Sequence, residues 1–164
     1  MARKTTITGA AIRDDSITGD DIDENTLMLP HFTTHKYTLT SSSDMILIRF
    51  NAAGSNTMGS SQVNNKFVAP TAGKLLMIKF RTTGTPGSTE MALMKIGDGT
   101  TNFGDPGVPA TNTTVDISSS NTVYTANFSS NNTFSAGDVL GIRINPTNNH
   151  GNVDLTCVWT LDFS

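Results

Sequence analysis

The end of the chain carries its clearest periodic pattern. Within residues 153–163 every second residue is apolar: Val153, Leu155, Cys157, Trp159, Leu161 and Phe163. Side chains two residues apart share a face only when the backbone is extended, so this pattern predicts a β-strand with one face in a core. No stretch of ten residues or more has a helical apolar period, which indicates that the body of the protein is built from strands.

Shorter strand-like runs fill the rest of the body, separated by clusters of Gly, Pro, Asn and Ser. We predict strands at residues 36–40, 45–51, 66–70, 74–82, 90–96, 113–118, 122–128 and 139–145. We expect residues 74–82 to be buried on both faces, and residues 113–118 and 122–128 to form a hairpin. Regular short strands of this kind predict an all-β fold, an antiparallel sandwich or jelly roll.

The first 29 residues follow a different rule. Ile7, Ile12, Ile17, Ile22 and Leu27 recur at intervals of five, which matches neither a helix nor a strand. One aliphatic side chain in five is too few to form a core, unless the same segment of neighbouring copies or a groove on another protein covers it. We therefore predict an extended N-terminal arm (residues 1–29) that attaches to a partner, followed by one β domain (residues 30–164).

Composition narrows the function classes. The net charge is −3 and no basic tract exists, so we expect no nucleic-acid or anionic-membrane partner. No signal peptide or membrane-spanning run is apparent. Cys157 is the only cysteine, so we expect a buried, inert thiol in a protein made in a reducing compartment.

Residues 28–35 contain Pro30, so we interpret them as a linker lying against the body rather than as a regular element. His31 and His35 are four residues apart, a spacing that would bring them to one face of a helix, which Pro30 disfavours. We expect no metal site there. His150 lies in an Asn/Gly-rich loop, and we expect it to be solvated.

Two acidic or Gly-rich segments could carry other chemistry. The arm contains Asp14, Asp15, Asp20, Asp21, Asp23 and Glu24. These could bind Ca²⁺ or Mg²⁺ at a subunit contact, but turn formation explains them better. Residues 97–105 have oxygen ligands among glycines without the spacing of an EF-hand, so a surface loop is the better interpretation. We therefore predict no metal and no cofactor. No Gly-x-Ser-x-Gly elbow or paired-carboxylate motif is present, so we predict no enzymatic activity.

Several motifs resemble segments of tailed-bacteriophage virion proteins. In the arm they are Ile7-Thr8-Gly9 and Ile17-Thr18-Gly19, each followed by Ile three residues on. In the body they are Phe67-Val68-Ala69-Pro70 with Gly73-Lys74-Leu75, Phe134-Ser135-Ala136-Gly137-Asp138-Val139-Leu140 and Val158-Trp159-Thr160-Leu161-Asp162-Phe163. The arm resembles those of capsid decoration (cement) proteins, head fibres and tail fibres. The body is similar to trimeric jelly-roll heads of the complement/tumour-necrosis-factor type.

This resemblance implies a homotrimer on the outside of the phage head, made in the host cytoplasm, with the arm binding the major capsid protein and clamping neighbouring subunits. The capsid-binding residues would be the five aliphatic residues that recur every five positions, called the ladder below: Ile7, Ile12, Ile17, Ile22 and Leu27. The residues that would pack in the core or at the trimer contact are Phe50, Phe80, Phe128 and Trp159. The alternative is a fibre-tip or spike module that binds a receptor or glycan through loops 52–65, 97–112 and 146–152. A polysaccharide hydrolase is a weaker alternative.

Overall fold

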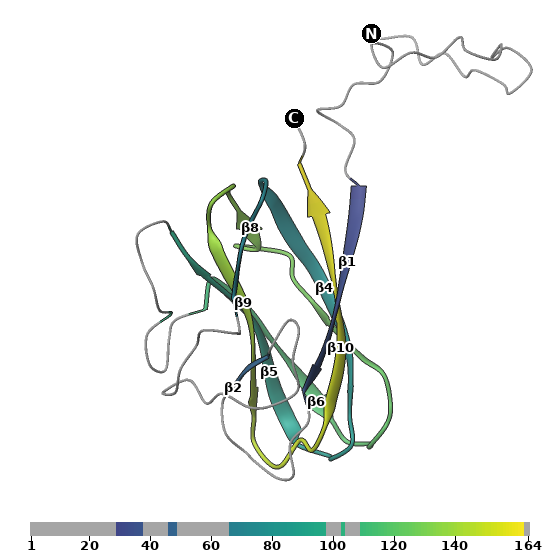
Figure 1. Ribbon diagram of the computed structural model, residues 1–164. Coiled ribbons are helices and arrows are strands. Elements are labelled where there is room, and N and C mark those ends of the chain that lie inside the picture. Colours follow the sequence, from purple (N-terminus) through teal and green to yellow (C-terminus); the bar gives the residue numbers. More distant parts are fainter. Residues whose placement is uncertain (1–28, 38–45, 49–65, 98–102, 104–108, 163–164) are drawn as a thin grey trace, which may run out of the picture.

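The computed structural model describes residues 29–37, 46–48, 66–97, 103 and 109–162. Within these residues the regular elements are all β-strands, arranged in two antiparallel sheets that pack against each other (Figure 1). The all-β prediction is therefore confirmed. The predicted arm up to Met28, the ends of the strands expected at 36–40 and 45–51, and the loop at 52–65 lie outside the described residues.

Each sheet has five strands. Sheet A has the order β1-β10-β4-β7, with β8 also pairing β4; its strands are β1 (Leu29–Tyr37), β10 (Val153–Leu161), β4 (Gly73–Thr82), β7 (Tyr124–Asn127) and β8 (Thr133–Phe134). Sheet B has the order β2-β9-β5-β6, with β3 also pairing β9; its strands are β2 (Ile46–Ile48), β9 (Val139–Pro146), β5 (Gly87–Ile96), β6 (Thr111–Ile117) and β3 (Phe67–Val68).

The core lies between the two sheets, and β10 supplies its centre. Val153, Leu155, Cys157 and Trp159 are buried, as their alternation predicts. Facing residues of both sheets complete one cluster: Leu75, Ile78, Phe80, Met91, Leu93, Ile117, Ala126, Phe128, Phe134, Leu140, Ile142 and Ile144. Phe80, Phe128 and Trp159 thus lie in the core of the single chain, while Phe50 lies outside the described residues.

The expected linker is instead the strand β1. It runs from Leu29 and pairs with β10 along its whole length, from Leu29↔Leu161 to Tyr37↔Val153. Pro30 is accommodated because β1 is an edge strand within the described residues, and an edge strand tolerates a missing amide donor. The linker interpretation was therefore wrong, because it treated Pro30 as a barrier to any regular element.

Strand β4 lies inside sheet A but buries one face only, contrary to the prediction. Its apolar run Leu75-Leu76-Met77-Ile78 is explained by a β-bulge: Trp159 pairs with Leu75 and Val158 with Met77, which leaves Leu76 as the extra residue. Leu75 and Ile78, three residues apart, therefore both face the core. Asn132 supports this irregularity, since its Nδ2 donates to the carbonyl oxygen of Leu75 at 2.7 Å.

Residues 113–118 and 122–128 do not form a hairpin. Strand β6 pairs with β5 in sheet B, whereas β7 pairs with β4 in sheet A, so the turn between them crosses from one sheet to the other. The backbone N–H of Asn121 donates to the carbonyl oxygen of Thr82 at 2.7 Å, and Asn121 adopts a φ of 57°. Turn residues alone could not reveal this, because a sandwich corner and a hairpin use the same residue types.

Strand β5 has two buried faces. Met91 and Leu93 face the main core, while Met94 packs with Phe103 on the other face, with Ile96 and Val139 beside them. A turn precedes β9: the backbone N–H of Ser135 donates to Asp138 Oδ2 at 2.8 Å, and Gly137 adopts a φ of 87°.

Candidate functional site

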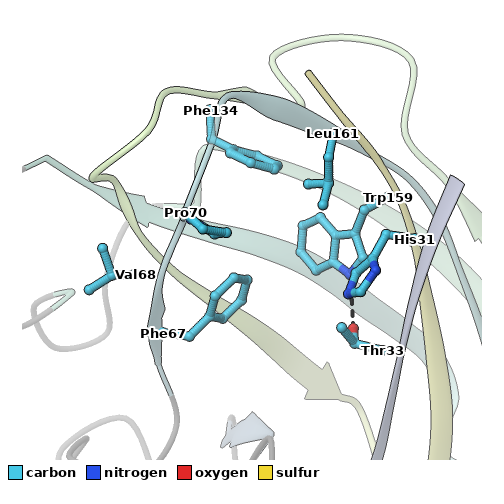
Figure 2. Close-up of a pocket in the computed structure, with 8 residues that line it drawn as sticks. All are labelled: His31, Thr33, Phe67, Val68, Pro70, Phe134, Trp159 and Leu161. Carbon is cyan, nitrogen blue, oxygen red and sulfur yellow. Dashed lines mark hydrogen bonds between the residues drawn. The ribbon is translucent and has the colours of Figure 1, made fainter. Parts of the chain in front are cut away.

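A pocket of about 370 Å³ opens between β1 at the edge of sheet A and β3 of sheet B (Figure 2). Its lining comes from strands β1, β3, β8 and β10 and from Pro70: His31, Thr33, Phe67, Val68, Pro70, Phe134, Trp159 and Leu161. Only His31 and Thr33 contribute polar side chains. This volume and lining are typical of a site for a small apolar group.

Three aromatic rings form much of the pocket wall. Trp159, the single tryptophan of the chain, lies edge-to-face with Phe67 at a centroid distance of 5.9 Å and with Phe134 at 5.8 Å. Such pairs are stabilising, because the positive edge of one ring faces the negative face of the other. The rings therefore form a pre-organised apolar surface, held by strands β3, β8 and β10.

Thr33 is the polar centre of this wall. Trp159 Nε1 donates to Thr33 Oγ1 at 2.8 Å, as the dashed line in Figure 2 shows. His35 Nε2 lies 2.9 Å from the same oxygen. Since an indole N–H is only a donor, Thr33 must accept from Trp159. The hydroxyl thus fixes the orientation of the indole ring.

Cys157 of β10 pairs directly with Thr33 of β1 and is fully buried, as expected from the sequence. Burial raises the pKa of the Cys157 thiol to about 12, and a hydrogen bond with the Thr33 side chain offsets this only in part. A thiol with such a pKa stays protonated at neutral pH, so Cys157 is an unreactive part of the core.

The three histidines lie differently from what the sequence suggested. His31 and His35 share the inward face of β1, opposite Trp159 and Leu155, because residues four apart share a face in a strand as well as in a helix. His31 is exposed at the pocket, whereas His35 is buried. Among the residues that the structure describes, no group of three or more His, Cys, Asp or Glu side chains could hold a metal ion.

His150 is fully buried, so the expectation that it is solvated was wrong. The turn after β4 packs tightly against the loop that contains His150. The Gly84 N–H donates to the carbonyl oxygen of His150 at 3.1 Å. A Cβ at Gly84 would lie 2.5 Å from the carbonyl oxygen of Asn149. The imidazole Nδ1 lies 2.6 Å from the carbonyl oxygen of Gly151. Contact between two distant turns therefore encloses a polar loop residue.

The outer face of sheet A carries an apolar row. Phe32, Val158 and Met77 occupy directly paired positions on β1, β10 and β4, and Phe32 is 60% exposed. Basic side chains surround the row: the strands of sheet A contain Lys36, Lys74, Lys79 and Arg81, but only one acidic residue, Asp154. Asp154 pairs with Arg81 at 3.0 Å and lies 3.9 Å from Lys36. This face is partly apolar and net positive.

A second charged cluster lies in sheet B. Arg143 of β9 forms an ion pair with Glu90 of β5, and the other oxygen of Glu90 accepts from Asn112 Nδ2 of β6 at 2.9 Å. The Arg143 side chain is almost fully buried. The cluster ties three neighbouring strands together, and we interpret it as structural.

The ladder residues Ile7, Ile12, Ile17, Ile22 and Leu27 lie outside the described residues. The pocket itself was missed by the sequence reasoning. Its signal was the alternation of His31, Thr33 and His35, which becomes informative once β1 is recognised as a strand that faces β10.

The fold and site thus define an all-β sandwich with an apolar pocket between β1 and β3. The outer face of sheet A is basic and partly apolar. No protein-family model matches the chain, and the search of curated proteins found no match. No helix among the described residues is long and apolar enough to cross a membrane.

Proposed function

We propose that the protein is a virion structural protein without enzymatic activity: a trimeric capsid decoration (cement) protein that binds the outside of a phage head. In this proposal the sandwich domains associate as a trimer, and the N-terminal arms bind the major capsid protein and clamp neighbouring subunits. The motifs of the arm and body, which resemble those of phage virion proteins, support this assignment.

The apolar row on sheet A is the observation that carries the proposal. An exposed phenylalanine in register with Val158 and Met77 leaves a continuous apolar strip on the outside of the single chain. Contiguous apolar patches on the surface of soluble proteins commonly mark contacts with other proteins. Association of copies through sheet A would bury this strip.

The strand order supports a jelly-roll topology. Consecutive strands mostly lie in different sheets: β1, β4 and β10 belong to sheet A, whereas β2, β5 and β9, each next to one of them in the sequence, belong to sheet B. The chain therefore passes repeatedly from one sheet to the other, as in Greek-key and jelly-roll sandwiches.

The ladder supports attachment by several arms at once. Burying one isoleucine side chain contributes about 1.5–3 kcal/mol. Ordering the backbone costs about 1–2 kcal/mol per residue, so a single arm with one aliphatic residue in five binds weakly at best. Three arms on one trimer would gain affinity through multivalency.

The oligomeric state tests the first half of the proposal. Native mass measurement of the full chain should give a trimer, and Phe32→Asp should shift it to monomer. Thr34→Asp is the matched control, because Thr34 shares the outer face of β1 but lies outside the apolar row. A monomeric wild type, or equal behaviour of the two variants, would contradict the role of this face.

Binding partners test the second half. The labelled full chain should bind phage heads assembled without it and should not bind host cells. Binding to host cells but not to heads would instead favour a fibre-tip or spike module that recognises a receptor or glycan.

A further inference from the structure

The pocket opens beside a strand edge that is unpaired within the described residues. Strand β1 pairs with β10 on one side only, and its inward-facing residues His31 and Thr33 line the pocket. An extended segment that paired with the open edge of β1 would direct every second side chain inward, toward the pocket between β1 and β3. Pro30 lies at the start of β1, so the missing donor leaves most of the edge available.

The chain supplies a segment next to this edge. Residues 1–28 precede β1 directly, so the root of the arm begins where the open edge begins. Asn25 and Thr26 are turn-forming residues, and a four-residue loop at 25–28 would allow the preceding residues to fold back antiparallel to β1. A covalently attached segment also has a high effective concentration at this edge, which favours it over the arm of another copy.

Strand register selects one ladder residue. With a loop at 25–28, Glu24 lies opposite Leu29 and Ile22 opposite His31. Residues directly opposite in an antiparallel pair share a face, so Ile22 faces inward with His31. Ile17 would lie opposite Lys36 and face outward. The period of five thus brings a single aliphatic side chain of the ladder to the pocket.

Size and charge agree with this arrangement. A cavity of about 150 Å³ accommodates a benzene molecule, so a pocket of about 370 Å³ has room for an isoleucine side chain. Residues 1–28 contain three basic and six acidic residues, a net charge of −3 that equals the net charge of the whole chain. The strands of sheet A, with four basic residues and one acidic residue, have a net charge of +3.

We propose that residues 17–24 of the same chain pair with the open edge of β1 and that Ile22 occupies the pocket. The root of the arm then belongs to the body, and the segment carrying Ile7 and Ile12 remains available to a partner. This inference concerns the free protein and does not depend on capsid binding.

Disulfide trapping in the full chain tests the proposal. The native Cys157 is buried and protonated, so it does not compete. The double variants Asp21→Cys/Phe32→Cys and Asp23→Cys/Phe32→Cys place thiols opposite each other in the two neighbouring hairpin registers. We expect at least one of them to form an intramolecular disulfide much faster than the control Thr6→Cys/Phe32→Cys. Disulfide-linked dimers, or equal rates in all three variants, would overturn the proposal.

Quenching of Trp159 fluorescence provides a second measurement. An apolar collisional quencher reaches Trp159 through an empty pocket, so Ile22→Asp should increase quenching severalfold, whereas Ile7→Asp should leave it unchanged. Equal quenching in the wild type and both variants would overturn the occupancy by Ile22. Neither experiment contains capsids. A negative result would therefore overturn the placement of residues 17–24 without bearing on the proposed capsid-binding function.

Discussion

At the scale of single residues, Thr33 shows how one hydroxyl positions an aromatic wall. It accepts the indole N–H of Trp159 and lies within hydrogen-bonding distance of His35. Thr33→Val keeps the shape but leaves the buried indole N–H without its acceptor, which costs about 1–3 kcal/mol. We expect a lower free energy of unfolding in denaturant titration. Thr34→Val, on the exposed face of β1, should change it by less than about 0.5 kcal/mol; equal effects would contradict this role of Thr33.

Cys157 should make stability fall at alkaline pH. Its pKa is about 12 in the folded protein, above the ordinary value of 9.0 for a solvated thiol, because burial disfavours the thiolate. The folded state therefore keeps the proton that the unfolded state releases. The thiol's contribution is complete below pH 9 and is lost as the pH rises toward 12, by about 1 kcal/mol per pH unit. Denaturation of wild type and Cys157→Ala between pH 8 and 11 should give a flatter pH dependence for the variant; identical slopes would contradict the assignment.

Residue-scale predictions succeeded where burial follows from local pattern. The alternation in residues 153–163 identified Cys157 and Trp159 as buried, and both are. The prediction that His150 is solvated was wrong, because the burial of this residue depends on the turn at Gly84, more than sixty residues away in the sequence. No local pattern carries that information.

At the scale of elements, the β4–β10 contact depends on a residue without a side chain. A Cβ at Gly73 would lie 2.4 Å from the carbonyl oxygen of Thr160 and 2.8 Å from the Phe134 ring. Gly73→Ala therefore forces β4, β8 and β10 apart, and we expect a loss of about 1–3 kcal/mol. Gly97→Ala is the control, since among the described residues no atom outside its chain neighbours lies within 4 Å of its Cβ position. Thermal unfolding should separate the two variants; equal midpoints would contradict the packing.

The ion pair of sheet B gives a further prediction. Arg143 is almost fully buried and Glu90 is its carboxylate partner. Glu90→Gln leaves a buried cation without its counter-charge, and we expect a loss of about 3 kcal/mol. Asp154→Asn removes the exposed partner of Arg81 and should cost less than about 1 kcal/mol. Urea titration measures both, and a reversed order would contradict a structural role for the Glu90–Arg143 pair.

Element boundaries were predictable where turn residues and alternation agreed, as in β9 and β10. Two element-scale errors have one origin. The expected linker at 28–35 and the expected hairpin at 113–128 both depended on local residue types, whereas sheet membership is decided by pairing with distant strands. The bulge at Leu76 likewise made a strand with one buried face look doubly apolar.

At the scale of the whole molecule, three features meet at β1: the start of the described body, the pocket beneath the strand and the exposed Phe32 above it. The sequence predicted the sandwich, but it could not reveal that the described body begins with a strand that lies at the edge of a sheet within the described residues. We therefore propose two tasks for this region: association of copies through sheet A, and presentation of the arm to a capsid.

The central claim is that the aliphatic ladder attaches the protein to the phage head, and co-sedimentation tests it most directly. The full chain and the variant Ile7→Asp/Ile12→Asp are mixed with heads assembled without the protein. We expect the wild type to sediment with the heads in multiples of three copies. The variant should remain in the supernatant with an unchanged oligomeric state. Equal sedimentation of both proteins, or no binding by the wild type, would contradict the account.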